Sequence, residues 1–561
     1  MYMMVFLCGL FIGVFSTSLL MYFFLSELVI LLEWKFLETF GLDYQWVMVV
    51  DKMSLMFLMT VSLISFSVYL FSVDYMSNEL NYYRFHTLLF VFVFSMYLLI
   101  LSPNLISMMV GWDGLGLSSF LLVIFYSNIK SLNSGLITLL SNRVGDVMLM
   151  ILIGYLLTLG EFTSVDYKWG VFSSLMIIVL MSAAFTKSAQ IPFMAWLPAA
   201  MAAPTPVSSL VHSSTLVTAG VYLLIRHQEL LNYFLMNTWV FYIGLISCLA
   251  ASLSALVECD LKKIIALSTL SQLGVMMVSI GLGSSLLAFS HLVGHAMFKA
   301  LMFISVGNFI HSANNYQDMR FMGMNYFFTK WINSFMLLSV LSLMAFPFMV
   351  AFFTKELIFE MSVLNLLGSL EILLFYFTIL LTPVYSYRLF YLYSIKQSNQ
   401  MLLMNSSHPS LVNYMSLIIL SLPATVVGGF LKMFLYSIPM VSISSKMFKM
   451  TTSLLVPIMF LIMSVSGLYF KNLKELVFFK LVGSLLFLNY LTPAVSFKAK
   501  EVAQLSFSYL DKSIISGSYN LMIKEMWIHI QGTGPLFQVD RTKIFLLFYF
   551  LGLGMFLVGA F

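Results

Sequence analysis

Charged residues are scarce in this chain. Lysine and arginine together number 28, and aspartate and glutamate 23, so only 9% of the 561 residues carry a formal charge. Soluble globular proteins carry about 25%. The chain cannot cover itself with a water-soluble surface, which excludes soluble enzymes and charged disordered tails. Apolar residues reach 61%, and this composition is typical of a polytopic membrane protein.

Features that hold cofactors are also missing. The cysteines Cys8, Cys248 and Cys259 are too few and too scattered for a disulfide framework, a structural zinc or an iron–sulfur cluster. The glycines of 111–116 sit inside an apolar run, which does not favour a dinucleotide site. No basic tract suits nucleic acid. We therefore expect no cofactor, metal or nucleic acid on this chain, and chemistry done by side chains and water.

The N-terminus has no import or secretion signal. Its first charged residue is Glu27 and its first basic residue is Lys35, so it matches neither an Arg-rich transit peptide nor the start of a secretory signal. Residues 4–24 are expected to form a retained membrane span. The missing signal indicates synthesis inside the compartment of use.

Apolar stretches recur along the whole chain. A hydrocarbon layer about 30 Å thick needs about 20 apolar residues per helix, which predicts an all-α fold with roughly 15 or 16 transmembrane helices. The clearest stretches are 53–72, 86–102, 104–127, 135–158, 205–226, 235–257, 262–281, 286–310, 369–393, 411–434, 452–470 and 543–560.

Two further stretches are interrupted by proline. Residues 172–200 carry Lys187 before two prolines, and residues 333–362 carry Pro347 before Lys355. Proline removes a hydrogen bond inside a helix, and the freed backbone groups then need protein or water as partners. Broken helices at corresponding positions of two halves are typical of inverted repeats with a midplane transport site.

Ionisable residues inside the predicted spans are the most informative feature. Each costs several kcal/mol in the membrane unless it is paired, hydrated or used. They are Asp113, Arg143, Asp146, Lys187, His212, His291, His295, Lys299, Lys355, Glu356 and Arg388.

His291, His295 and Lys299 are spaced four residues apart and share one helix face. Paired histidines at this spacing can bind zinc, but the lysine places a competing charge beside the ion. Polar contacts with neighbouring helices are a second interpretation. A proton-conducting row with water between its members fits the pattern best.

Other ionisable residues leave more than one interpretation open. His212 precedes three hydroxyl residues, 213–215, which can hold a file of water, although a histidine that only bonds a neighbouring helix is nearly as well supported. Arg143 and Asp146 are three residues apart and are interpreted first as a supporting ion pair. Arg388 lies near a helix end, where its side chain can reach the membrane surface.

Lys187 and Asp113 suggest a switch. At an effective dielectric constant near 20, a carboxylate about 4 Å from an amine contributes roughly 4 kcal/mol. Moving one proton against about 180 mV costs on the order of 4 kcal/mol. Moving Asp113 toward or away from Lys187 would therefore be enough to change the lysine between its charged and neutral forms. A static ion pair between two helices would use the same residues.

Several runs in order carry a family resemblance. They are 111–116, 141–146, 187–190, 196–198, 203–208, 212–215, 260–264, 271–274, 291–299, 346–347 and 355–356. With these runs the chain resembles the subunit 5 family of mitochondrial NADH:ubiquinone oxidoreductase (respiratory complex I). Members of this family are antiporter-like subunits of the membrane arm. The resemblance is strong over about residues 50–395. In the rest of the chain only the arrangement of the predicted segments resembles the family.

The resemblance implies a role for each residue of the candidate site. The family's carboxylate falls on Asp113, although many members have glutamate there, and its lysine of the first broken helix falls on Lys187. The bridging histidine falls on His212 and the lysine of the second broken helix on Lys355, with Glu356 beside it. The connecting row falls on His291, His295 and Lys299. Together these groups would form a hydrated axis across the membrane midplane.

The resemblance also implies a domain layout. Residues 1–85 would hold N-terminal spans and a connecting loop, 86–400 the antiporter-like core, and 401–492 additional spans. Residues 493–542 would form a lateral amphipathic helix before an anchoring span at 543–561, although a surface loop with a helical patch remains open for that segment. Longer family members carry an extra N-terminal span that this chain does not show.

The implied function is proton translocation coupled to NADH oxidation by ubiquinone. NADH, FMN, iron–sulfur clusters and ubiquinone would bind to other subunits. The expected partners are other membrane-arm subunits and membrane lipids, including cardiolipin. The expected location is the mitochondrial inner membrane, with the chain encoded in the organelle. Two alternatives stay open: a cation/proton antiporter subunit of the related bacterial type, and a structural membrane-arm scaffold whose charges only pair helices.

Overall fold

The computed structural model describes most of the first 435 residues. The described residues are 29–39, 42–159, 174–313, 316–320, 330–364, 368–395 and 410–435, with isolated positions at 13, 457, 458, 483 and 504. In this part of the chain, ten helices are long and apolar enough to span a membrane. The predicted helical membrane fold is therefore confirmed, although the described part is mostly rather than entirely helical. The spans predicted at 4–24, 452–470 and 543–560 and the lateral helix at 493–542 lie outside the described residues.

A two-stranded hairpin precedes the first described membrane helix. Strand β1 (Ile30–Thr39) pairs antiparallel with β2 (Leu42–Val50), and Trp34 lies opposite Trp46. The sequence predicts only N-terminal spans and a connecting loop in this part of the chain. Both segments contain β-branched and aromatic residues, which favour strands, but a search for helix-length apolar stretches does not detect two short strands.

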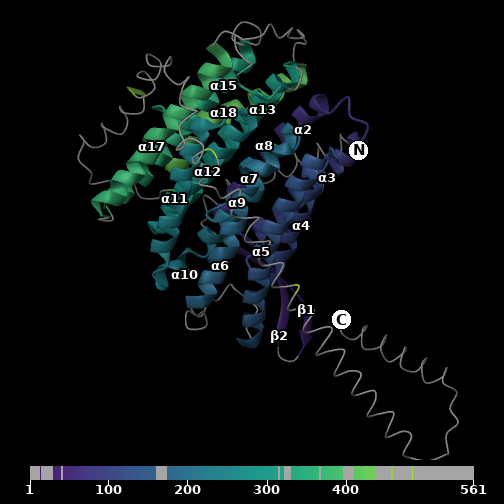
Figure 1. Ribbon diagram of the computed structural model, residues 1–561. Helices are drawn as coiled ribbons and strands as arrows, with labels where there is room; N and C mark the ends of the chain where they lie inside the picture. The colour runs from purple at the N-terminus through teal and green to yellow at the C-terminus, as the bar shows by residue number, and fades with distance from the viewer. Residues whose placement is uncertain are drawn as a thin grey trace, which may run out of the picture. The chain divides into compact units, whose positions relative to one another are not determined.

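The helices then cross the bundle back and forth (Figure 1). The first four are α2 (Lys52–Tyr75), α3 (Tyr82–Leu101), α4 (Leu105–Val123) and α5 (Ile129–Leu159). After the first broken helix and η2 (Ala200–Ala202) come α8 (Thr205–Leu210), η3 (Val211–Thr215), α9 (Leu216–Arg226), α10 (Gln228–Tyr233), α11 (Asn237–Val257), α12 (Leu261–Gly281) and α13 (Ser285–Ser312). The last described helices are α17 (Ser369–Phe390), η4 (Tyr391–Ile395) and α18 (Leu411–Leu435).

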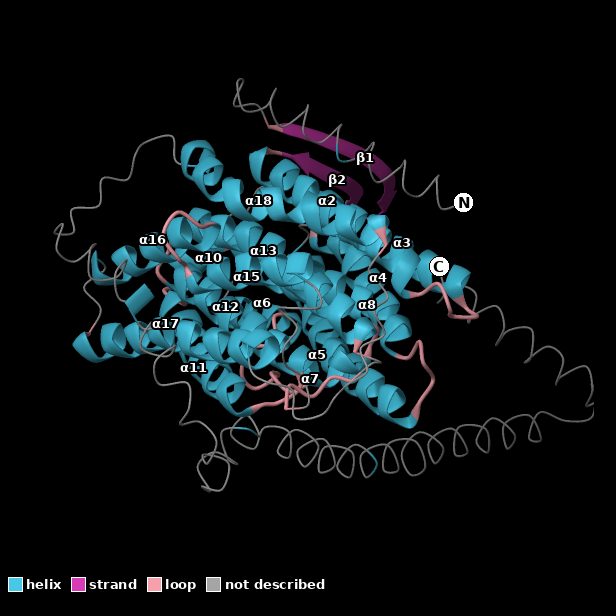
Figure 2. Cartoon of the chain, turned by 90° about the horizontal axis from the view of Figure 1, so that it is seen from above, coloured by secondary structure: helices cyan, strands magenta, loops and turns pink. Residues whose placement is uncertain are grey.

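Helix α13 lies in the middle of the bundle (Figure 2). Every residue from Leu287 to Ile310 is buried, and the neighbouring α12 is buried continuously from Ile264 to Ile280. A helix that is apolar on every side has to be covered by other helices. The polar residues within these two buried stretches are therefore enclosed by protein.

The first interrupted helix is broken between α6 (Ser174–Lys187) and α7 (Trp196–Ala199). Ala189 has a φ of 52°, the left-handed conformation that ends many helices. The next amide, that of Gln190, donates back to the carbonyl of Phe185 at 3.0 Å. A non-glycine residue in this conformation costs about 1 kcal/mol or more, so the surrounding structure has to stabilise the break.

The second interrupted helix ends its first half in the same way. It is broken between α15 (Lys330–Met344) and α16 (Val350–Leu364). Ala345 has a φ of 64°, and the amide of Phe346 donates to the carbonyl of Leu341 at 3.1 Å. Both breaks therefore use an alanine where glycine is the usual residue.

The two broken helices enter the bundle from opposite faces. Between the start of α6 and the start of α15 the chain crosses the bundle five times, through α6–α7, α8–α9, α11, α12 and α13. An odd number of crossings brings the chain to the opposite face. The paired breaks therefore have the inverted arrangement that the sequence predicts.

Candidate functional site

Lys187 is the last residue of α6 and is completely buried. Its Nζ donates a hydrogen bond of 2.5 Å to the carbonyl oxygen of Trp112 on α4. The same amine lies 4.0 Å from the centroid of the Trp112 ring, within the range of a cation–π contact. Trp112 therefore contacts the lysine through both its backbone and its side chain.

The carboxylate connected to this contact is Asp146 rather than Asp113. The indole Nε1–H of Trp112 donates to Oδ1 of Asp146 on α5 at 3.0 Å. Lys187 forms no ion pair within 4.0 Å with either carboxylate. The direct pair expected between Asp113 and Lys187 is therefore not formed, and Asp146, which the sequence analysis treated as a supporting residue, approaches the lysine through a tryptophan.

Arg143 joins the two carboxylates. Its Nη1 lies 3.2 Å from Asp146, as the predicted ion pair requires, and 3.9 Å from Asp113. The side chains of Arg143 and Asp113 are 45% and 37% exposed, whereas that of Asp146 is 12% exposed. The cluster is therefore partly exposed at its Asp113 end and completely buried at its Lys187 end.

Two glycines allow the helices around Lys187 to approach closely. A Cβ on Gly145 of α5 would lie 2.2 Å from the Thr186 hydroxyl oxygen. A Cβ on Gly220 of α9 would lie 2.4 Å from the carbonyl oxygen of Ala184. Both distances are far below van der Waals contact. Side chains at these positions would push α5 and α9 away from α6, on which Lys187 lies.

His212 lies in the π-helical segment η3 between α8 and α9. It is buried, and its ring lies 6.1 Å from the ring of Trp196. Neither ring nitrogen has a hydrogen-bond partner among the residues that the structure describes. The interpretation of His212 as a histidine that bonds a neighbouring helix is therefore wrong for this structure. Single π-helical turns are frequent at functional sites.

The hydroxyls after His212 bond their own helix. Thr215 donates to the carbonyl of Leu210 at 2.8 Å, Ser214 donates to the same carbonyl at 3.1 Å, and Ser213 donates to that of Ser209. A π-helical turn interrupts the regular backbone ladder and leaves a carbonyl without its usual amide. The hydroxyls take the place of that amide, and only their lone pairs are left for water.

Helix α13 supplies three completely buried groups, His291, His295 and Lys299. The Nδ1 of His291 lies 2.8 Å from the hydroxyl of Thr354, and Lys299 donates to the hydroxyl of Ser268. Neither ring nitrogen of His295 has a partner among the described residues. Two of the three groups therefore make the polar contacts of the alternative interpretation, and His295 does not.

Lys355 lies on α16, just beyond the second break. Its Nζ donates to the carbonyl of Leu343, at the end of α15, at 2.7 Å. It follows Thr354, which contacts His291. The next residue, Glu356, is only partly buried.

We call six of these residues the buried row: Lys187, His212, His291, His295, Lys299 and Lys355. All six have an exposure of 4% or less. Polar groups enclosed in this way are normally hydrogen-bonded to protein or to water. Imidazole and amine groups with open positions can accept and pass on protons. Within the described part of the chain, no group of three or more His, Cys, Asp or Glu side chains is placed to hold a metal.

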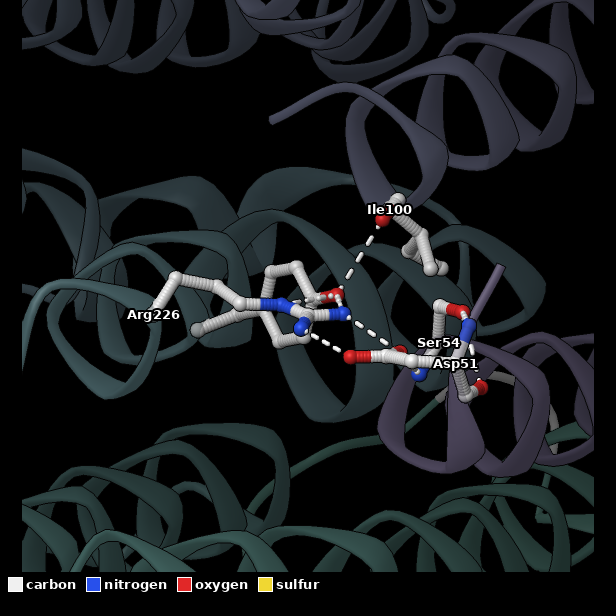
Figure 3. Close-up of polar contacts among 5 residues, drawn as sticks. Asp51, Ser54, Ile100 and Arg226 are labelled. Carbon is white, nitrogen blue, oxygen red and sulfur yellow. Dashed lines mark hydrogen bonds and ion pairs between the residues drawn. The ribbon is translucent and has the colours of Figure 1, made fainter. Parts of the chain in front are cut away.

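A second polar cluster, which the sequence does not predict, includes Asp51, Ser54 and Arg226 (Figure 3). Asp51, at the start of α2, accepts two hydrogen bonds from Arg226 at the end of α9. Arg226 also donates to the hydroxyl of Tyr222, which donates to the carbonyl of Ile100 on α3 at 3.1 Å. The Asp51 cluster, which also includes Ser54, therefore joins the ends of three helices.

The charge of Asp51 is stabilised by its partners. Burial raises the pKa of Asp51, but the hydrogen bonds and positive charge of Arg226 outweigh burial and hold that pKa below its ordinary value of 3.8. The backbone amide of Ser54 also donates to this carboxylate, at 2.7 Å. The only sequence signal was an aspartate before an apolar stretch, which is typical of a helix N-cap.

Family models and solved structures match most of this architecture. A model described as NADH:quinone oxidoreductase/Mrp antiporter, TM matches residues 102–382, and one described as NADH-Ubiquinone oxidoreductase (complex I), chain 5 N-terminus matches residues 34–86. A chain in the structure of the Mrp complex from Dietzia sp. DQ12-45-1b has a TM-score of 0.75 at 23% identity, covering 95% of this chain and 61% of that chain. A chain of the membrane-bound sulfane sulfur reductase, an archaeal respiratory membrane complex, has a TM-score of 0.67 at 16% identity, with 77% and 90% covered. These two likenesses show the fold.

Sequence relatives identify the family. NADH-ubiquinone oxidoreductase chain 5 of Locusta migratoria is 47% identical over 64% of this chain and 64% of its own length. The protein of the same name from Anopheles quadrimaculatus is 39% identical over 97% of this chain and 96% of its own length. The resemblance carried by the sequence motifs is confirmed, and the chain belongs to the family of NADH-ubiquinone oxidoreductase chain 5.

Proposed function

We propose that this chain is a proton-translocating membrane subunit of the H+-translocating NADH:ubiquinone oxidoreductase, respiratory complex I. The observation that carries the proposal is the buried row, in which amines and imidazoles lie enclosed between two oppositely directed broken helices. Unpartnered imidazoles at His212 and His295 are costly in a purely structural protein. The same groups are useful where protons have to cross a membrane.

Each end of the row has a lysine held by a backbone carbonyl. Lys187 is bonded to Trp112 and Lys355 to Leu343. A carbonyl accepts a hydrogen bond without adding a full negative charge, so it does not lock the amine in its charged form as a carboxylate would. Protons would move between these ends through His212, the α13 groups and water.

The carboxylates at the Lys187 end supply the switching charge in this proposal. Displacement of Asp146 or of the Arg143–Asp113 pair changes the field at the lysine, and Trp112 transmits the position of Asp146 directly. We also include Glu356, the residue that follows Lys355, in the proposed site. NADH, FMN, iron–sulfur clusters and ubiquinone would be held by other subunits.

The proposed setting is the mitochondrial inner membrane, among the other membrane-arm subunits and lipids such as cardiolipin. Relatives with 47% and 39% identity carry the name of a subunit of that oxidoreductase. A chain of this composition, with ten apolar helices in its described part, is not expected to act as a soluble monomer. We also propose that the chain is encoded in the organelle.

The first alternative is a cation/proton antiporter subunit of the Mrp type. The fold is shared with a chain of such a complex, at 23% identity. The higher identity of the complex I relatives favours the first proposal. The second alternative, a scaffold, does not explain imidazoles without partners.

The decisive experiment compares two substitutions of one lysine in the assembled complex. Lys187→Met removes the amine, and Lys187→Arg keeps a positive charge that does not become neutral in proteins. A proton relay predicts that both variants lose proton pumping in proteoliposomes. A scaffold predicts that arginine restores it. Lys263→Met serves as the control, because Lys263 pairs with Asp260 outside the row, with 43% of its side chain exposed.

A further inference from the structure

A group of buried polar side chains lies beside the row without belonging to it. Ser271 and Gln272 on α12 are completely buried, and Tyr385 on α17 is 1% exposed. The hydroxyl oxygens of Tyr385 and Ser271 lie 3.2 Å apart. Because the Ser271 hydroxyl already donates to the carbonyl of Ser268 at 2.9 Å, Tyr385 is the donor between the two hydroxyls.

This group lies at the same level along the α12–α13 helix pair as the buried groups of α13. Helices α12 and α13 form an antiparallel pair joined by a short turn after Gly281, and Lys299 donates to Ser268 across the pair. One turn further along α12 is Gln272, and one turn back along α13 is His295. Four residues correspond to about 6 Å in either helix, so Gln272 and His295 lie at the same level.

Polar atoms at this level lack protein partners. Neither the amide oxygen nor the amide nitrogen of Gln272 has a hydrogen-bond partner in the described part of the chain, and the same holds for both nitrogens of His295. The Gln272 amide lies beside the Tyr385 hydroxyl but outside hydrogen-bonding geometry. Buried groups with this many open positions are the usual places for ordered water.

We propose that Tyr385, Ser271 and Gln272 form a side branch of the proton relay, which leaves the buried row at His295 and Lys299. The inference rests on the proposed function and extends it to residues on α12 and α17. Gln272 would hold water against His295, and the Tyr385 hydroxyl would pass protons between that water and Ser271.

The proposed transfer needs no additional reactant. When water gives a proton to the Tyr385 oxygen, the O–H proton of Tyr385 passes to the Ser271 oxygen. The Ser271 hydroxyl, turned away from the Ser268 carbonyl that it bonds at rest, gives its own proton to a second water. Each step breaks one O–H bond and forms another, so the phenol and the alcohol are regenerated. Rotation of the hydroxyls then resets the branch.

The position of α17 gives the branch a direction. One turn beyond Tyr385 lies Arg388, whose Nη1 donates to the carbonyl of Ala255 at 3.1 Å. Ala255 is in the last turn of α11, close to the start of α12. This bond places the end of α17 near the face where α11 ends and α12 begins, and the branch would lead from the middle of the bundle toward that face. The same hydrogen bond shows that Arg388 contacts a neighbouring helix and does not only reach the membrane surface.

A purely structural role would not explain all of these buried polar groups. The bond between Tyr385 and Ser271 would be enough to hold α17 against α12. It would leave two unpartnered polar atoms on Gln272 and an unpartnered histidine at the same level, at a cost of about 1–3 kcal/mol for each unsatisfied group. A water-holding branch explains all three residues together.

The test uses Tyr385→Phe and Gln272→Leu in the assembled complex, with Tyr387→Phe as the matched control. Tyr387 is on the same helix, is also buried, and stacks on Tyr391 at 5.9 Å. We expect both branch variants to slow proton translocation in proteoliposomes by about tenfold, the change that corresponds to one hydrogen bond of about 1.4 kcal/mol. The control should pump at the normal rate, and normal pumping in both branch variants would overturn the inference.

Two further variants keep the result interpretable. If Tyr385→Phe does not assemble, Ser271→Ala breaks the same connection and leaves the ring in place, and normal pumping in that variant would also overturn the branch. Lys299→Met tests the row itself. Loss of pumping in Lys299→Met together with normal pumping in the branch variants would reject only the branch, whereas normal pumping in Lys299→Met would reject the proposed function.

Discussion

The amine of Lys355 donates to the carbonyl of Leu343 across the break that separates α15 from α16. The carbonyls at the end of a helix have no amide partner within that helix and carry a partial negative charge. The lysine therefore caps the first half of the broken helix, and under the proposed function it would also be the terminal proton carrier of the row.

This double role predicts different effects for two substitutions. Lys355→Met should lower both the amount of assembled complex and proton pumping, because an unpartnered buried carbonyl costs about 1–3 kcal/mol. Lys355→Arg should restore assembly without pumping, because its guanidinium can cap the carbonyl but does not become neutral. Native gels and pumping assays measure the two effects, and pumping by the arginine variant would contradict the proposed role.

Trp112 should matter through its indole N–H. Trp112→Phe keeps an aromatic ring against Lys187 but removes the donor to Asp146. We expect pumping to fall while NADH oxidation and assembly change less, because the lysine loses its connection to the carboxylate. Trp239→Phe is the control, since Trp239 is 63% exposed on α11. Equal effects of the two substitutions would exclude a specific role for the indole.

His212 and His227 form a matched pair of buried histidines. His212 has no hydrogen-bond partner among the described residues, whereas Nδ1 of His227 lies 2.7 Å from the carbonyl of Leu223. His212→Leu should abolish pumping without lowering thermal stability, because it removes buried polar atoms that have no partner. His227→Leu should lower stability by about 1–3 kcal/mol and leave pumping intact. Normal pumping by the His212→Leu variant would show that His212 takes no part in proton transfer.

Gly145 should tolerate no side chain. In Gly145→Ala the new methyl group would lie 2.2 Å from the Thr186 hydroxyl oxygen, and overpacking of this kind costs about 1–3 kcal/mol. Gly154→Ala on the same helix meets nothing within 4 Å and should be neutral or stabilising by up to about 1 kcal/mol. Thermal unfolding of the purified complex distinguishes them, and equal melting temperatures would contradict the close approach of α5 and α6.

The Asp51 cluster predicts a defined dependence of stability on pH. The pKa of Asp51 is lower in the folded chain than its ordinary value of 3.8. Its stabilising contribution is therefore complete above the ordinary value and is lost as the pH falls through the lower, folded pKa. Between about pH 6 and 8, well above both the folded and the ordinary pKa, this group contributes a constant stability, and thermal unfolding measured at falling pH should show its loss only below about pH 4.

A double-mutant cycle measures the same cluster at neutral pH. Asp51→Asn and Arg226→Gln should each cost about 1–3 kcal/mol, and the double variant should cost less than their sum because each removes the same charged hydrogen bonds. Unfolding in denaturant provides the measurement. Additive costs would show that the two side chains do not interact in the membrane.

The sequence by itself determined the class of the protein and the members of the row. Scarce charge and recurring apolar stretches are sums over neighbouring residues, so the spans near α2 and α13 could be predicted without knowing any contact. Buried ionisable residues such as Lys187 and His295 stand out because the membrane makes them costly.

Only the tertiary structure decided how the row is connected. The bond between Trp112 and Asp146 joins residues 34 positions apart, and that between Arg226 and Asp51 joins residues 175 positions apart. Hydropathy reports whether a segment enters the membrane, but not which face of one helix meets which face of another. This packing connects Asp146, and not Asp113, to Lys187 through Trp112, and it leaves both ring nitrogens of His212 without a partner among the described residues. Hydrogen bonds depend on distances within an ångström, which no local sequence pattern encodes.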